Sequence, residues 1–276
     1  MSHQSPVDRA RQRAHMPRGT ETILDTRTLA TAHRRLAQLL RPGLLVLDVG
    51  CGTGAMTRGM AEAVAPDGLA VGVDVHAGLL AQAYHTHGSV PGLAFTRGDV
   101  YSLPCRGVFD VVTAARVLQW LAHPLEALRA LMAATKPGGS VVVLDYNHEK
   151  IVWEPAPPPS MQYFYGAFLQ WRADAGMDNT LADRLGDLCV QCGLVDVVHT
   201  PQPEVSQRSD PDFATRLGIW AAVAASRGQQ MVADGLLTEA QRATAEAEYR
   251  AWVHDQARSQ TMYLIAVEGR RGDSTV

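Results

Sequence analysis

Three alternating glycines in the stretch LDVGCGTG, residues 47–54, are the first residues whose spacing could do chemistry. Gly50, Gly52 and Gly54 follow a short apolar run and precede a segment whose apolar residues have helical spacing. A strand that ends in such a loop lets main-chain N–H groups approach a ligand without interference from Cβ atoms. The ligand could be an amino-acid carboxylate. It could also be a dinucleotide pyrophosphate, because Gly50, Gly52 and Ala55 fit the pattern G-x-G-x-x-G/A.

Carboxylates at three predicted strand ends decide between these ligands. Asp48, just before the first glycine, would repel a pyrophosphate and suits an ammonium group or a water network. Asp74 ends the second predicted strand, where a carboxylate can accept hydrogen bonds from both ribose hydroxyls. Asp99 follows the third strand and can accept an adenine amine, while the N–H of Val100 can bind a ring nitrogen. Asp48 and Asp99 could instead be cap or turn residues. Their joint spacing favours a ligand with an amino-acid end, a ribose and an adenine, which is S-adenosylmethionine, over NAD or NADP.

Five stretches in a fixed order carry a family resemblance: VLDVGCGTG (46–54), GVDV (72–75), RGDVYSLP (97–104), FDVVTAARVLQWLAHP (109–124) and LMAATKPGGSVVVLD (131–145). As a set they resemble the class I S-adenosylmethionine-dependent methyltransferases, including the enzymes of ubiquinone and menaquinone biosynthesis and many enzymes that methylate specialised metabolites. The resemblance implies a Rossmann-like, doubly wound α/β sheet of seven strands whose last strand is antiparallel. It also implies S-adenosylmethionine as the cofactor.

The same resemblance assigns residues to parts of the cofactor. It implies that the glycines surround the methionine end, that Asp74 binds the ribose, and that Asp99 and Val100 bind the adenine. It also implies that the main-chain carbonyl of Arg116 accepts a hydrogen bond from the methionyl ammonium. His76 could flank the adenine or begin a turn. The expected cofactor-binding residues are Asp48, Gly50, Cys51, Gly52, Gly54, Asp74, Val75, His76, Asp99, Val100 and Arg116.

Polar residues after the fourth and fifth predicted strands are the candidates for catalysis. Methyl transfer from a sulfonium is an in-line displacement, and it needs a base only when the acceptor must lose a proton. We expect His148 to act as that base and Tyr146 to orient the acceptor, although Asn147 and His148 could instead cap a turn that faces solvent. No metal is expected. The expected substrate-binding residues are Gln119, Trp120, Asn147, Tyr163 and Tyr165.

Alternating strand and helix patterns predict a parallel, doubly wound sheet. The pattern predicts a helix at about 20–40 and helices at 55–64, 78–86, 124–134 and 181–192. Predicted strands are 44–49, 69–73, 93–97, 109–114, 140–145, 195–199 and 261–268, with a mainly helical stretch over 201–260. The helix at 124–134 is expected to stop at KPGG, and DYNHEK (145–150) is expected to be a loop. The expected division is an N-terminal helical segment (1–43), a methyltransferase domain (44–270) with insertions at about 150–180 and 201–260, and a tail (271–276).

Composition narrows the classes of function. The chain has 276 residues, 46% of them hydrophobic and 19% charged, with a formal net charge of −3. That charge gives no general attraction to nucleic acid or to an anionic membrane. The first residues, MSHQSPVDRARQR, lack the apolar region of a secretory signal, so a cytoplasmic location is expected. The C-x-x-C of Cys189 and Cys192 has no second ligand pair and predicts buried helix residues.

The leading hypothesis is methyl transfer to a small-molecule acceptor, with no nucleic-acid or membrane partner and with a monomer or homodimer left open. Methylation of RNA or protein, a non-catalytic nucleoside-binding module and a nicotinamide oxidoreductase are the alternatives. Asp48 and Asp99 argue against the oxidoreductase. The sequence leaves open which acceptor is methylated and whether oxygen, nitrogen, sulfur or carbon receives the methyl group.

Overall fold

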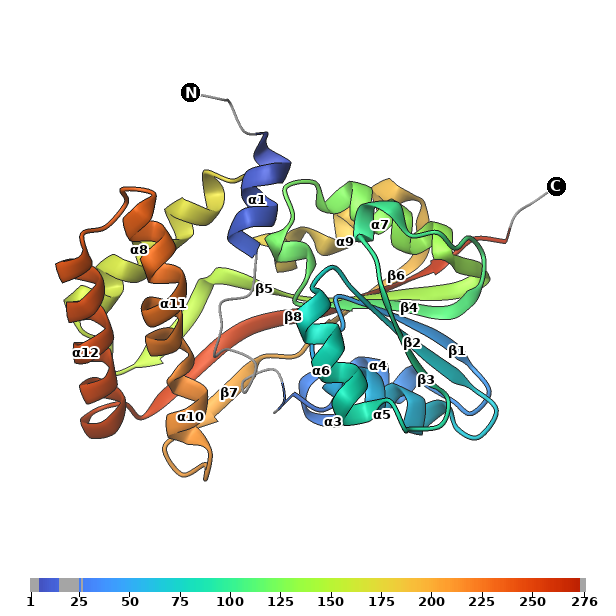
Figure 1. The fold of residues 1–276 in the computed structure, drawn as a ribbon, viewed down its shortest axis with the longest axis horizontal. Coiled ribbons are helices and arrows are strands. Elements are labelled where there is room, and N and C mark those ends of the chain that lie inside the picture. The colour runs from blue at the N-terminus through green and yellow to red at the C-terminus, as the bar shows by residue number, and fades with distance from the viewer. Residues whose placement is uncertain (1–4, 15–24, 26, 274–276) are drawn as a thin grey trace.

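One eight-stranded sheet forms the centre of the protein, as a computed structural model that describes residues 5–14, 25 and 27–273 shows (Figure 1). The strand order is β3-β2-β1-β4-β5-β8-β6, and β7 pairs with β8 beside this path. Strands β1 to β5 are mutually parallel, whereas β8 is antiparallel to its neighbours. The strands are β1 (Leu45–Val49), β2 (Leu69–Asp74), β3 (Leu93–Arg97), β4 (Phe109–Ala115), β5 (Thr135–Glu154), β6 (Leu194–Pro201), β7 (Glu204–Gln207) and β8 (Ser259–Arg271).

Helices cover both faces of the sheet because neighbouring strand residues point to opposite sides. Val46 packs with the helices α3 (Leu29–Ala32), α4 (Arg34–Leu39) and α5 (Ala55–Val64). Leu47, the next residue, packs on the opposite face with α7 (Pro124–Ala134) and α9 (Leu181–Cys192). Helix α6 (Ala77–His87) packs on Phe95 of β3. Strands buried on both faces in this way read as continuous apolar runs.

A lobe of helices extends from one end of the sheet (Figure 1). Strands β5 and β8 continue beyond their neighbours as an antiparallel pair, with a register shift between Asn147 and Val152. Their extensions carry α8 (Pro159–Ala173), α10 (Phe213–Leu217), α11 (Ile219–Ala233) and α12 (Glu239–Asp255), which have an aromatic core of their own with these strands.

Helix α1 (Pro6–Ala14) lies between this lobe and the helices on the sheet (Figure 1). Ala10 is 2% exposed and packs with Ala175 and Met177. The helix also contacts the short 3₁₀ helix η2 (Leu118–Trp120), which follows β4. A second 3₁₀ helix, η1 (Val100–Ser102), follows β3. Among the described residues, no helix is long and apolar enough to cross a membrane.

The structure confirms the predicted α/β class and its antiparallel last strand, and it corrects several elements. The helix expected at 20–40 is broken at His33, whose φ of −146° and ψ of 65° are not helical, and its part at 20–24 and 26 lies outside the described residues. The sequence predicts that the fifth strand begins at residue 140, after KPGG. In the structure β5 already begins at Thr135 and includes KPGG. The expected loop DYNHEK is strand, because Tyr146 and Asn147 pair with Leu264 and Tyr263 of β8. The stretch at 201–260 contains β7 besides its helices.

The prediction for the cysteine pair is confirmed. Cys189 and Cys192 are buried in the last turn of α9, and both thiols are free. Gly193 ends the helix with a φ of +98°, which favours glycine.

Candidate active site

The glycine loop connects β1 to α5 in a conformation that needs glycine. Gly50, Gly52 and Gly54 have φ values of +79°, +56° and +78°. A Cβ atom on Gly50 would collide with the Val117 side chain. The N–H groups of Gly50 and Cys51 both donate to the carbonyl of Val73, which holds the loop against the end of β2.

Asp48 supplies a buried acceptor behind this loop. One carboxylate oxygen accepts a hydrogen bond of 2.7 Å from Thr57, and the other has no partner among the described residues. Burial raises the pKa of Asp48 to about 6, and the Asp74 charge adds to the rise while the Thr57 hydrogen bond opposes it. A buried acceptor without a donor costs free energy, so this oxygen fits a ligand that brings a cationic donor.

Asp74 is held at the end of β2 by two main-chain donors. The N–H of Gly52 and the N–H of His76 each donate to a different carboxylate oxygen, both at 2.8 Å. Each oxygen keeps a free lone pair, so both can still accept a hydroxyl of a ribose. The neighbouring Val75 side chain is exposed, which leaves it at the surface beside this carboxylate.

Asp99 already has a cationic partner. One of its oxygens accepts from the N–H of Tyr101 at 3.0 Å, and the other lies 2.5 Å from the Arg11 guanidinium of α1. Val100, which begins η1, is buried. Helix α1 therefore lies across the carboxylate that the sequence assigns to adenine.

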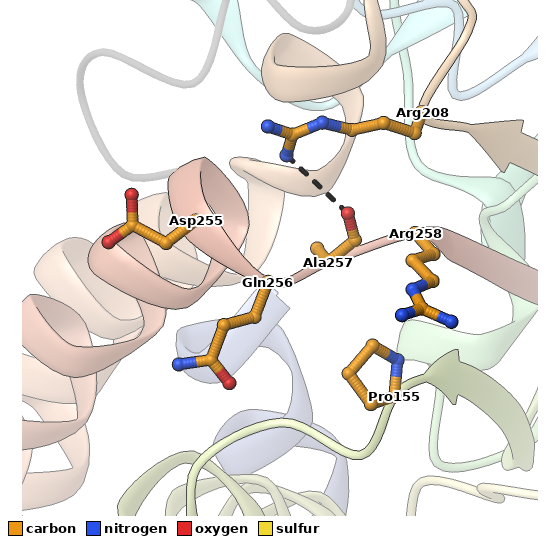
Figure 2. A pocket seen from close by; sticks show the side chains of 6 residues that line it. All are labelled: Pro155, Arg208, Asp255, Gln256, Ala257 and Arg258. Carbon is orange, nitrogen blue, oxygen red and sulfur yellow. Dashed lines mark hydrogen bonds between the residues drawn. The ribbon is translucent and has the colours of Figure 1, made fainter.

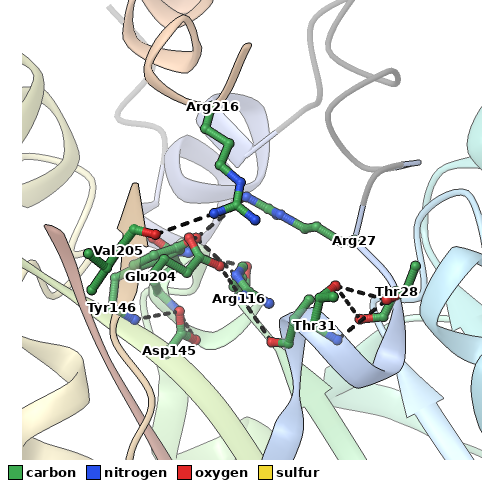
Figure 3. Close-up of polar contacts among 11 residues, drawn as sticks. Arg27, Thr28, Thr31, Arg116, Asp145, Tyr146, Glu204, Val205 and Arg216 are labelled. Atoms are coloured by element: carbon green, nitrogen blue, oxygen red, sulfur yellow. Dashed lines mark hydrogen bonds and ion pairs between the residues drawn. The ribbon is translucent and has the colours of Figure 1, made fainter. Parts of the chain in front are cut away.

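Arg116 directly follows β4 and has a φ of +61°. Its main chain and its side chain have different partners. Its carbonyl accepts a hydrogen bond of 3.3 Å from the side chain of Gln119. Its guanidinium donates to the Tyr146 hydroxyl at 2.9 Å and forms an ion pair with Glu204 of β7 (Figure 3). Burial lowers the pKa of Arg116, but the charges of Glu204 and Tyr146 outweigh this and raise it overall. Sequence reasoning missed Glu204 because it missed β7.

His148 is buried rather than facing solvent. Its Nε2 lies 2.5 Å from the side-chain oxygen of Gln119, and its carbonyl accepts a hydrogen bond of 2.7 Å from Tyr165. Burial lowers the pKa of His148 well below its ordinary value, and the Arg172 charge adds to this. The imidazole is therefore neutral near pH 7. Tyr146 lies on the same face of β5, with the two ring centroids 5.3 Å apart.

Two expected substrate-binding residues, Asn147 and Tyr163, lie away from the side chains of Tyr146 and His148. Asn147 points to the other face of β5, where it donates to Asp183 of α9 at 2.8 Å. Tyr163 is 55% exposed on the outer side of α8. A helix turns by about 100° per residue, so Tyr163 and Tyr165 face nearly opposite directions.

A known family matches the part of the chain that contains the glycine loop and the ends of β2, β3 and β4. Residues 46–139 match the family model of a methyltransferase domain. This match identifies residues 46–139 as a methyltransferase domain. A phosphoethanolamine N-methyltransferase of Haemonchus contortus, solved in complex with S-adenosyl-L-methionine, shares the fold with a TM-score of 0.53, 17% identity, and coverage of 89% of this chain and 52% of that one.

Curated relatives match up to about half of the chain. The demethylmenaquinone methyltransferase of Lactococcus lactis is 35% identical over 109 residues, which are 38% of this chain and 43% of the relative. The ubiquinone/menaquinone biosynthesis C-methyltransferase UbiE of Burkholderia vietnamiensis is 33% identical over 138 residues, 49% of this chain and 55% of the relative. The chain thus spans about half the length of these relatives. The crystal structure of the [4+2]-cyclase SpnF shares the fold, with a TM-score of 0.53, 21% identity, and coverage of 92% of this chain and 81% of that one.

Two buried arginines from outside residues 46–139 enclose Trp120. The guanidinium carbons of Arg172 (α8) and Arg227 (α11) lie 4.5 Å and 4.0 Å from the Trp120 ring centroid. Burial lowers the pKa of Arg172 to about 10 and that of Arg227 to about 9. Neither forms an ion pair with a carboxylate of the described residues. The sequence alone assigns no role to these arginines, because helical spacing does not show what the lobe packs against.

Two shallow pockets lie on the lobe rather than beside the glycine loop. The first has a volume of about 520 Å³, and in it Arg208 donates to main-chain carbonyls at the end of α12 (Figure 2). The second, of about 460 Å³, includes the outward-facing Tyr163. Neither contains a residue of the glycine loop or of the strand ends. Within the described part of the chain, no group of three or more His, Cys, Asp or Glu could hold a metal.

Proposed function

We propose that the protein transfers the methyl group of S-adenosylmethionine to a small-molecule acceptor, a metabolite or natural product. The domain division expected from the sequence is part of this proposal: a methyltransferase domain over 44–270, a helical segment before it, and insertions at about 150–180 and 201–260. The lobe formed by these insertions would cover the acceptor.

In this proposal each strand end binds a different part of the cofactor. The glycine loop takes the methionine end, and the unpartnered oxygen of Asp48 accepts from its ammonium group or an intervening water. Asp74 takes the ribose hydroxyls, and Asp99 with Val100 takes the adenine. The sulfonium supplies the methyl group when bound. Tyr146 and His148 then lie on the face of β5 where an acceptor would be oriented and, if necessary, deprotonated.

The observation that carries the proposal is the cover over the carboxyl end of β4 and the adjoining part of β5. Gln119, in η2 after β4, is 2% exposed, and His148, within β5, is 4% exposed. The lobe and α1 both pack over this edge, and Ala10 of α1 is itself buried. A covered, aromatic-lined site suits a small acceptor rather than an RNA or protein surface.

A second candidate is a module that holds the nucleoside without transferring its methyl group. SpnF, which shares the fold, is described as a [4+2]-cyclase, so this architecture also occurs in a protein with another named activity. Formation of S-adenosylhomocysteine distinguishes the candidates, because only methyl transfer produces it.

The test combines labelled S-adenosylmethionine, the purified protein and a cell extract separated into small-molecule, RNA and protein fractions. We expect the label in a small-molecule product together with S-adenosylhomocysteine, and no label with Asp74→Ala. Label in the RNA or protein fraction would contradict the small-molecule proposal. Binding of S-adenosylmethionine without formation of S-adenosylhomocysteine in any fraction would favour the non-catalytic module.

A further inference from the structure

Three arginines from separate segments meet where β4 ends, beside the middle of β5. We call Arg27, Arg116 and Arg216 the arginine cluster. Arg27 lies just before α3, Arg116 directly follows β4 and Arg216 belongs to α10. In Figure 3 the side chains of Arg216 and Arg27 enter from different sides, and Arg216 donates to the carbonyl of Val205, the residue after Glu204, at 3.3 Å. Like charges do not gather in this way without a gain elsewhere.

The carboxylates of the cluster are already engaged. One oxygen of Glu204 pairs with Arg116, and the other accepts from the Tyr146 hydroxyl at 3.1 Å. Arg216 pairs with the exposed Asp212 at 2.8 Å. Arg27 contacts the Tyr146 hydroxyl at 3.4 Å and forms no ion pair with a carboxylate of the described residues. Asp145 also faces Arg116, but burial raises its pKa to about 7, so it compensates the cluster only in part. Three guanidinium charges therefore face two paired carboxylates and this partly protonated one, which leaves positive charge in excess.

Part of this excess is buried. The Arg116 side chain is 4% exposed, and its Nη1 has no hydrogen-bond partner among the described residues. The neighbouring His33 adds no further charge, because burial and the Arg116 charge lower its pKa to about 3 and keep it neutral. A buried guanidinium with an unused donor is costly unless an anion completes its surroundings.

The cofactor side of the site has the opposite charge. Asp48, Asp74 and Asp99 lie along the glycine loop and the ends of β2 and β3. The glycine loop is a separate place for the methionine end of the cofactor, although its N–H groups at Gly50, Cys51, Gly52 and Gly54 already donate within the protein. The arginine cluster therefore lies on the acceptor side, next to Tyr146.

We propose that the arginine cluster binds an oxyanion, a carboxylate or a phosphate, carried by the methyl acceptor. This inference rests on the proposed methyl transfer. The planar guanidinium fork matches both oxyanions. Aromatic rings continue from Tyr146 on the same face, since the His148 ring lies 6.2 Å from that of Phe168 and 6.3 Å from that of Trp220. The acceptor is thus an anion with an aromatic or extended apolar body.

The experiment is calorimetry on the full chain with S-adenosylhomocysteine already bound. Benzoate and phenyl phosphate are the anionic probes, and benzamide is the uncharged probe of the same shape as benzoate. We expect at least one anion to bind about tenfold or more tightly than benzamide, because hydrogen bonds to charged groups are worth about that factor. The tighter anion identifies whether the oxyanion is a carboxylate or a phosphate.

Arg27→Gln and Arg216→Gln test the cluster, with Arg250→Gln as the matched control. Arg250 is 57% exposed on α12 and pairs with Glu246 on the same helix. We expect each cluster variant to lose about tenfold in affinity for the anion. Benzamide binding and S-adenosylhomocysteine affinity should be unchanged, as should all affinities of the control.

Several results would overturn the inference alone. These are equal binding of the anions and benzamide, no anion binding at millimolar concentration, or unchanged anion affinity in both cluster variants. A fall in S-adenosylhomocysteine affinity in Arg27→Gln would also overturn it, since the arginine would then serve the cofactor's carboxylate. A wild-type protein that does not bind S-adenosylhomocysteine would contradict the proposed function itself, so that affinity is measured first.

Discussion

The guanidinium of Arg11 lies 2.5 Å from the carboxylate of Asp99, although the two residues are 88 positions apart. This ion pair ties α1 to the end of β3. Arg227 strengthens the attachment by donating to the carbonyl of Arg13 in the last turn of the same helix. If Asp99 accepts the adenine amine, Arg11 and the cofactor compete for one carboxylate. The Arg11 side chain is 57% exposed, and ion pairs of this kind are worth only about 0–1 kcal/mol.

We therefore predict that Arg11→Gln binds S-adenosylhomocysteine more tightly than the wild type, by up to about fivefold. The gain should shrink at high salt, because screening weakens the competing ion pair in the wild type. Calorimetry at low and high salt measures both effects, with Arg34→Gln, an exposed residue of α4, as the control. Weaker binding by Arg11→Gln would show that Arg11 assists the cofactor rather than competing with it.

Asp74 should contribute most to cofactor affinity. We predict that Asp74→Ala loses roughly 2–3 kcal/mol of binding free energy, because both ribose hydroxyls lose a charged acceptor. The same carboxylate also accepts from Gly52 and His76, so a thermal melt of the variant without ligand is needed to separate binding from folding. Asp74→Asn, which keeps the shape, should lie between the wild type and Asp74→Ala. Calorimetry with unchanged affinity in Asp74→Ala would remove Asp74 from the cofactor site.

The elements that sequence predicts well have local causes. Helices α5, α7 and α9 have the predicted bounds, because apolar spacing, Pro124 and Gly193 mark their ends within the segment itself. The extension of β5 and the whole of β7 depend instead on pairing with β8, more than a hundred residues away from β5. Their sequences lack the apolar alternation that would reveal a strand.

The residues of the candidate site also fall into two groups: those that local sequence predicts and those that depend on packing of distant segments. Asp48, Asp74 and Asp99 could be predicted together, because the ends of parallel strands meet at one edge of the sheet. Glu204 and Arg227 come from segments whose position depends on how the lobe packs, so no local spacing assigns them to the site. The helical position of Tyr163 was equally ambiguous until the packing of α8 fixed which side faces outward.

The pH dependence of the unfolding free energy should show the effect of the lowered pKa of His33. Burial and the Arg116 charge lower its pKa to about 3 in the folded protein, against about 6.5 in the unfolded chain. Between these values the unfolded chain binds the extra proton. The unfolding free energy therefore falls as the pH drops below about 6.5, by up to about 1.4 kcal/mol per pH unit.

We predict that His33→Leu loses less stability than the wild type between pH 7 and pH 5. Near pH 8 it should be at least as stable, because both ring nitrogens of His33 lack partners among the described residues. Denaturant unfolding at several pH values measures this, with the exposed His254→Gln as the control. Some loss at low pH should remain, since the pKa of His148 is also lowered. Parallel curves for His33→Leu and the wild type would contradict the assignment.

The last prediction concerns His148 as a base. If the acceptor must lose a proton, His148→Ala should lower the rate of methyl transfer by roughly a hundredfold or more and leave cofactor affinity nearly intact. The folded pKa of His148 lies well below 6.5, so its base form is present throughout the neutral range. The wild-type rate should therefore show no histidine inflection near pH 6.5. The residual rate of the variant should rise with pH, as the acceptor ionises by itself.

Two further variants separate chemistry from packing, using the acceptor found with labelled S-adenosylmethionine. Gln119→Met removes the partner of Nε2, so it should lower the rate less than His148→Ala does, without the rise with pH. Tyr165→Phe removes the hydrogen bond to the His148 carbonyl and should affect stability more than rate. Wild-type turnover by His148→Ala at neutral pH would exclude His148 as a base. Positioning of the acceptor against the sulfonium would then be the main source of the rate.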